Sequence, residues 1–133
     1  MVFNNFFANL NSAIRKNLIF VEIPFTNKIF NVLSILRTEG FINNFRVSQN
    51  KIFVFLKYFN KRPVLKQINC ISKKSRKVFS RFNEFLILHK NLEKFFKKHS
   101  NHCLIIQTSK GLVSDKTARR LGLGGKLIAV AFS

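Results

Sequence analysis

Acidic residues are scarce in this sequence of 133 residues. Five Asp and Glu stand against 24 Lys and Arg, so the formal net charge is +19. The five acids are widely spaced, and no two are placed as a pair for general acid and base catalysis. The sequence therefore predicts a protein that is not an enzyme, with no catalytic residue, no cofactor and no small-molecule substrate.

Cysteine and histidine are also rare. Cys70 and Cys103 stand apart, without the CxxC spacing of redox or zinc sites. His99 and His102 lie close to Cys103, but a tetrahedral zinc site needs a fourth ligand, which would have to come from His89, Cys70 or an acid elsewhere in the chain. We expect two reduced core thiols, as in intracellular proteins, and no metal site.

Long apolar runs are missing as well. The longest, Leu127 to Phe132, has six residues, whereas a span of the bilayer needs about 18. The first seven residues have neither the basic region of a secretory signal nor the Arg/Ser-rich character of a transit peptide. We therefore expect no membrane insertion and no leader. Tyr occurs once and Trp never, while Phe, Lys, Asn and Ile abound, which suggests an AT-rich genome such as an organelle's.

Apolar residues are nevertheless plentiful. They make up 47% of the chain, with 17 Phe, which is enough for the core of one domain or two small ones and excludes a disordered basic tail. So large a positive charge on a small folded body repels itself. It predicts a polyanionic partner, either nucleic acid or an anionic membrane surface.

The first sixty residues alternate helical and strand-like patterns. Apolar residues recur at three-and-four spacing in two segments, and Gly40 follows the second at the position of a left-handed helix cap. The pattern predicts an α-β-α-β-β unit over residues 1–60. Its elements are a helix over 3–14, a strand over 18–23 that ends at Pro24, a helix that ends near Glu39, and a β-hairpin of strands 41–47 and 51–58 around Ser48-Gln49-Asn50.

The segment Asn60-Lys61-Arg62-Pro63 is predicted to be a linker to a second unit, residues 61–133. That unit is expected to be mostly β with short helices, so the fold class is α+β. The predicted elements are strands over 64–71, 77–79, 103–106 and 126–132, a helix over 91–98, and a short helix that Asp115 caps and that runs through Arg120. Residues 61–100 alone hold twelve Lys and Arg against two Glu, which concentrates the basic surface here.

A polar loop is expected at residues 107–111. Thr108, Ser109 and Lys110 carry small hydroxyls and an ammonium beside Gly111, a combination that can approach base edges, 2′-hydroxyls and phosphates. A simple turn without function explains the same residues. Most Phe are expected in the core, and only Phe79 is a candidate for base stacking.

A glycine-rich stretch, Gly122 to Lys126, follows. It matches neither the P-loop, which needs Gly five places before the Gly-Lys pair, nor GxGxxG. We expect these glycines to allow a tight turn or close backbone approach.

The segment from Thr108-Ser109-Lys110-Gly111 through Gly124-Gly125 resembles the signature of the S-eight family of small-subunit ribosomal proteins. The similarity continues upstream over nearly the whole chain. It includes Asn11 to Arg15, Glu39 to Ile42, Leu56 to Tyr58, Ile71 to Lys73, and Arg76 to Phe79.

This resemblance implies an RNA-binding protein that binds the central domain of small-subunit ribosomal RNA early in assembly, beside neighbouring ribosomal proteins. The absence of a leader fits an organelle-encoded copy that works in the mitochondrial matrix. The implied RNA-binding residues are Lys73, Lys74, Arg76, Phe79, Gln107, Thr108, Ser109, Lys110, Gly111, Gly124, Gly125 and Lys126.

The sequence departs from the family pattern at several of these positions. Gln107 replaces a Ser, Lys126 replaces an acid, and Phe79 replaces a Tyr, which removes an O–H donor. The region Ser80 to His102 is longer than usual. The alternative is a nonspecific binder of nucleic acid or anionic membrane surfaces, which would show a one-faced cationic helix and no structured polar loop.

Overall fold

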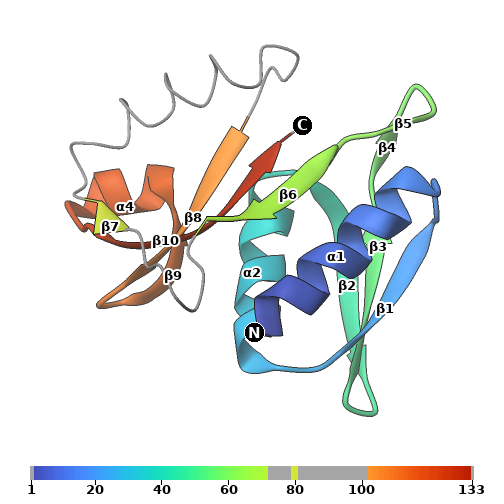
Figure 1. Ribbon diagram of the computed structural model, residues 1–133, viewed down its shortest axis with the longest axis horizontal. Coiled ribbons are helices and arrows are strands. Elements are labelled where there is room, and N and C mark those ends of the chain that lie inside the picture. Colours follow the sequence, from blue (N-terminus) through green and yellow to red (C-terminus); the bar gives the residue numbers. More distant parts are fainter. Residues whose placement is uncertain (1, 72–78, 81–101, 133) are drawn as a thin grey trace. The chain divides into compact units, whose positions relative to one another are not determined.

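A computed structural model describes residues 2–71, 79–80 and 102–132, which form two compact units, residues 1–68 and 69–132 (Figure 1). The elements are α1 (Val2–Arg15), β1 (Phe20–Pro24), α2 (Asn27–Thr38), β2 (Ile42–Ser48), β3 (Lys51–Leu56), β4 (Tyr58–Phe59), β5 (Arg62–Pro63), β6 (Gln67–Cys70), β7 (Phe79–Ser80), β8 (His102–Thr108), β9 (Gly111–Ser114), α4 (Asp115–Leu121) and β10 (Gly125–Phe132). The α+β class and the N-terminal α-β-α-β-β order are confirmed.

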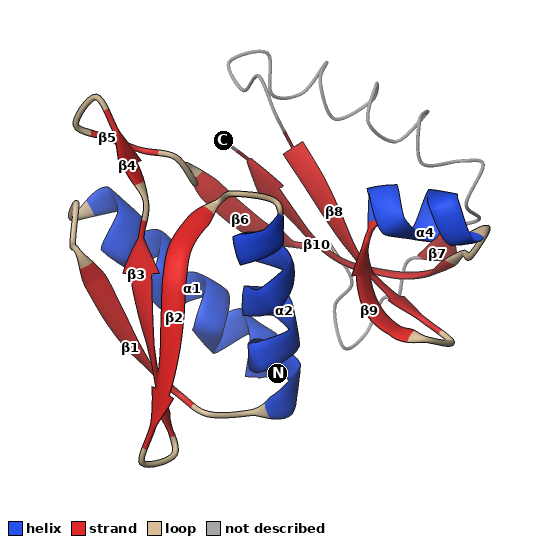
Figure 2. Ribbon diagram, turned by 180° about the vertical axis from the view of Figure 1, so that it is seen from behind, coloured by secondary structure: helices blue, strands red, loops and turns tan. Residues whose placement is uncertain are grey.

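The first unit is an antiparallel sheet with strand order β1-β3-β2 and two helices (Figure 2). Alternate residues of β3 point to opposite faces of the sheet, and only the residues on one of these faces are buried. Ile52, Val54 and Leu56 are buried, as are the apolar residues of α1 and α2 that pack on this unit's core. Both helices therefore cover the same face, which leaves the other face open.

The boundaries of α2 follow the expected chemistry. Thr26 caps its N-terminus by accepting a hydrogen bond from the backbone N–H of Ile29 at 3.2 Å. Glu39 ends the helix, and Gly40 has φ +83°, the left-handed conformation predicted for it. The turn between β2 and β3 also needs left-handed residues, and Gln49 and Asn50 supply them.

The linker predicted at Asn60 to Pro63 is wrong. Residues 58–63 form a second, smaller hairpin in which Tyr58 pairs with Pro63 and Phe59 with Arg62. Asn60 and Lys61 make its two-residue turn, with φ of +51° and +65°. The polar residues of this segment predict a break between units, but positive φ at both turn positions bends the chain back on itself. A separate functional unit at 61–133 stays a prediction.

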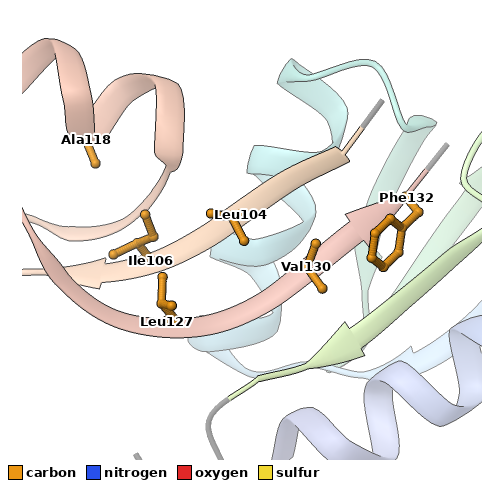
Figure 3. Packing of buried hydrophobic residues seen from close by; sticks show 6 residues of the cluster. All are labelled: Leu104, Ile106, Ala118, Leu127, Val130 and Phe132. Atoms are coloured by element: carbon orange, nitrogen blue, oxygen red, sulfur yellow. The ribbon is translucent and has the colours of Figure 1, made fainter. Parts of the chain in front are cut away.

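The second unit is built on a sheet with the order β6-β10-β8-β9, and β7 also pairs with β10. The helix α4 packs on β8 and β9. The core of this unit is formed by buried side chains from β8, α4 and β10, which Figure 3 shows. They are Leu104, Ile106, Ala118, Leu127, Val130 and Phe132.

The two cysteines are thiols and are not joined in a disulfide. Cys103 is buried as predicted, whereas Cys70 is only half-buried at the end of β6. The strand predicted over 64–71 is confined to Gln67–Cys70. The helix predicted over 91–98 lies outside the described residues.

The cap of α4 corrects another prediction. Ser114, not Asp115, is the N-cap, and its hydroxyl accepts a hydrogen bond from the N–H of Thr117 at 3.3 Å. Asp115 is the first helical residue and only 1% exposed. Its carboxylate accepts a hydrogen bond from the N–H of Leu104 at 3.4 Å and lies 3.9 Å from the guanidinium of Arg119, so the buried charge is compensated.

Candidate nucleic-acid interface

The predicted polar loop is a tight β-hairpin turn. Gln107 and Thr108 are the last residues of β8, Ser109 and Lys110 form the turn, and Gly111 opens β9. Thr108 pairs with Gly111, whose φ of +102° explains why a glycine is needed there. The structure has a turn where the sequence predicts a longer loop, because the sequence pattern does not predict β9. Pairing with β9 extends β8 by two residues beyond its predicted end.

The hydroxyl of Thr108 is used inside this turn. It donates a hydrogen bond to the carbonyl of Gly111 at 2.9 Å and accepts one from the N–H of Lys110 at 3.2 Å. The residue is 7% exposed. Ser109 and Lys110, by contrast, are exposed at the tip. The Thr108 hydroxyl therefore shapes the turn, and the groups presented to solvent are those of its two neighbours.

Sheet register brings distant candidate residues together. Lys126 on β10 pairs with Gln107 on one side and with Phe79 on the other. Paired positions across an antiparallel ladder lie on the same face of a sheet. Phe79, Lys126 and Gln107 thus occupy one row across three neighbouring strands.

Gly125 meets the backbone of β8 at close range. A Cβ atom built on Gly125 would lie 2.1 Å from the carbonyl oxygen of Gln107 and 2.9 Å from its carbon. The expectation of close backbone approach is therefore confirmed for this glycine. Gly124, just before it, is exposed. The contact seats the start of β10 directly beside the turn residues.

The remaining predicted site residues, Lys73, Lys74 and Arg76, lie outside the described residues. One cation that the sequence did not single out is Arg119. Its side chain is one-third exposed, and its Nε is buried without a hydrogen-bond partner among the described residues. The i,i+4 spacing from Asp115 was the available signal.

The described part of the second unit has a net positive charge. Its acid, Asp115, is buried and compensated, whereas its cations are mostly exposed or half-exposed: Lys110, Lys116, Arg119, Arg120 and Lys126. Across the described residues, no helix is long and apolar enough to cross a membrane. In the same residues, no three His, Cys, Asp or Glu gather as metal ligands.

A rigid turn that presents hydroxyl, amide and ammonium groups, with further cations on α4 and β10, is typical of α+β proteins that bind RNA by shape, phosphates and base edges. Comparison with known proteins agrees with this class. The model of the family described as Ribosomal protein S8 matches residues 2–132. The chain belongs to this family.

Individual relatives are similar over most of their length. Small ribosomal subunit protein uS8 of Buchnera aphidicola subsp. Cinara cedri is 35% identical over 115 residues, which is 84% of this chain and 82% of the relative. The uS8 protein of Citrifermentans bemidjiense is 35% identical over 117 residues, with the same coverage. Small ribosomal subunit protein uS8m of Acanthamoeba castellanii is 35% identical over 99 residues, 74% of this chain and 72% of the relative.

Proposed function

We propose that this chain is a structural component of the small ribosomal subunit and that it binds small-subunit ribosomal RNA beside neighbouring ribosomal proteins. The observation that carries the proposal is the family match over residues 2–132. The family resemblance further suggests the central domain of that RNA as the target and a role in its assembly. The described geometry supports an RNA contact at the β8–β9 turn.

In this proposal the turn residues divide the work. Ser109 and Gln107 are exposed and hydrogen-bond to base edges or 2′-hydroxyls, while Lys110 and Lys126 neutralise phosphates. Other residues either hold the turn in its shape or allow the RNA backbone to approach closely. They are Thr108, Gly111, Gly124 and Gly125.

Four further residues complete the proposed surface on sequence grounds. Phe79 pairs with Lys126 through its backbone, and we assign it to base stacking. Phosphate contacts are assigned to Lys73, Lys74 and Arg76.

Binding measurements separate this function from a nonspecific one. A central-domain fragment of the small-subunit RNA from the same organism is compared with a scrambled RNA of equal length by filter binding over a range of salt. Specific recognition requires roughly a thousandfold preference or more for the fragment. Equal affinity for the two RNAs at every salt concentration would remove the proposal, and flotation with anionic liposomes would then test the membrane-surface alternative.

Two variants test the division of work. Ser109→Ala should weaken fragment binding by about 1–3 kcal/mol without changing the salt dependence, because it leaves an RNA partner unsatisfied. Lys110→Ala should lower the salt slope by about one phosphate contact. Ser48→Ala, which removes an exposed hydroxyl at the end of β2 in the first unit, is the control and should bind as the unchanged protein does.

We also propose that the ribosome concerned is mitochondrial. The composition suggests an organellar genome, and the uS8m relative is as similar as the bacterial relatives are. Co-sedimentation of the protein with small subunits from purified mitochondria is the test. Recovery only with cytoplasmic or plastid subunits would contradict this assignment.

A further inference from the structure

The β4–β5 hairpin presents an aromatic ring to solvent. Phe59, the last residue of β4, is 72% exposed, although most large apolar side chains of the first unit are buried. A shallow groove of about 550 Å³ opens beside it. The groove is lined by Phe59, Asn60, Arg62, Pro63, Val64 and Lys66.

Cations are concentrated around Phe59 in the sequence, and no acid lies near it there. Residues 40–83 contain no Asp or Glu. Within ten residues of chain, four side chains are cationic and exposed: Lys57, Lys61, Arg62 and Lys66. Such a surface favours an anionic partner.

The hairpin is held firmly at its base. The hydroxyl of Tyr58 donates a hydrogen bond to the carbonyl of Leu18, and the N–H of Val64 donates one to the carbonyl of Lys57 at 2.9 Å. Burial raises the pKa of the Tyr58 phenol, so the donor keeps its proton at neutral pH. A ring on so fixed a base loses little freedom when a partner binds.

Lys61 is not the residue that would give this position of the turn its highest stability. Its φ of +65° lies in the left-handed region, where glycine is free of the steric cost that a Lys side chain carries. The residue places an exposed ammonium at the tip of the hairpin. Strain at an exposed cationic position is the kind that accompanies a binding role.

We propose that the β4–β5 hairpin is a second RNA contact, in which Phe59 stacks on an unpaired base and the four surrounding cations neutralise the flanking phosphates. An exposed ring next to cations fits single-stranded RNA, whose bases offer a free face, better than a duplex, whose bases are already stacked. The inference rests on the proposed function, because it takes RNA as the partner. It adds a contact in the first unit.

Fluorescence offers a direct test, because the sequence contains no Trp. Phe59→Trp places a single reporter at the proposed stacking position. Titration with a short single-stranded oligoadenylate should quench its emission saturably, whereas a duplex of equal phosphate concentration should quench it far less. The control is Val47→Trp, at a position 44% exposed near the β2–β3 turn, at the other end of β3 (Figures 1 and 2).

Equal quenching of the two reporters, or equal quenching by single strand and duplex, would overturn the stacking. A blue shift with vesicles of anionic lipid and no quenching by RNA would assign the hairpin to a membrane surface instead.

A second test uses the strained turn. Lys61→Gly removes the cation and relieves the backbone, so we expect an unchanged or higher melting temperature together with several-fold weaker binding to the ribosomal RNA fragment. Asn50→Gly makes the same backbone change, without the loss of a charge, at the matching position of the β2–β3 turn and should leave binding unchanged. Unaltered affinity of Lys61→Gly and of Phe59→Ala would refute the contact.

RNA binding by the unchanged protein distinguishes a failure of the hairpin contact from a failure of the proposed function. If it prefers the ribosomal fragment over scrambled RNA while the hairpin variants bind equally well, the hairpin contact is wrong and the proposed function stands. If it shows no preference, the proposed function is wrong, and the Phe59→Trp titration still decides whether the hairpin binds single-stranded RNA.

Discussion

Asn11 on α1 holds a strand segment that lies 57 residues further along the chain. Its side-chain amide donates a hydrogen bond to the carbonyl of Ile68 at 2.8 Å and accepts one from the N–H of the same residue at 3.0 Å. Ile68 is fully buried. Asn11→Ala therefore removes two bonds to backbone groups that water reaches poorly.

The expected loss follows from these two bonds. A typical intramolecular hydrogen bond contributes about 0.5–1.5 kcal/mol, and a buried group left without its partner costs more. We expect Asn11→Ala to lower the free energy of unfolding by about 2–3 kcal/mol. Asn9 on the same helix is exposed, so Asn9→Ala shares the gain in helix propensity of about 0.5 kcal/mol without the loss.

Urea unfolding followed by far-ultraviolet circular dichroism measures this difference. With a slope of about 1–3 kcal/mol per molar urea, the midpoint of Asn11→Ala should fall about 1 M or more below that of Asn9→Ala. Both Asn11 and Ile68 belong to the first unit, so a transition of that unit must report the change. Equal midpoints for the two variants would refute the argument that this amide holds the backbone of Ile68 to α1.

Gly125→Ala should destabilise the second unit by about 1–3 kcal/mol or more, because the added methyl meets the carbonyl of Gln107, which is backbone and cannot rotate away. An unchanged melting temperature would show that the strands separate easily at this point. Ser114→Ala removes the cap of α4 and should cost about 1 kcal/mol in thermal unfolding, whereas Ser114→Thr should keep most of it. The raised pKa of Tyr58 means that its contribution to stability is present below pH 10 and is lost as the pH rises through the folded-state value. Tyr58→Phe should therefore lose less stability than the unchanged protein as the pH rises above 10, and parallel alkaline unfolding curves would contradict this sign.

Local patterns predicted much of the first unit because its elements obey local rules. The three-and-four spacing of Phe3, Phe6, Phe7 and Leu10 places all four on the buried face of α1. Gly40 marks the end of α2 because no other residue adopts positive φ so readily. Such signals depend on neighbours in sequence, so they are visible without the fold.

The missed features depend on pairing between distant segments or on unusual residues at positive φ. A Lys residue at positive φ, such as Lys61 at +65°, is rare. The sequence therefore predicts a linker where the structure has a hairpin. The row of Phe79, Lys126 and Gln107 follows from the register of three strands, which no local pattern contains. Likewise the hydrogen bonds of the Thr108 hydroxyl depend on the turn between β8 and β9, and the sequence pattern does not predict β9.

The sheet of the second unit has a consequence for synthesis. β10 pairs with β7 and β8 and lies next to β6, and all three precede it in the sequence. While a chain is being made, β6 and β7 can pair with β10 only after β10 has been synthesised, whereas β8 already has β9 as a partner, and β1, β2 and β3 of the first unit already have theirs. A chain that stops before β10 lacks both the centre of this sheet and the row around Gln107. The row of Phe79, Lys126 and Gln107 is therefore assembled only after the last strand has been made.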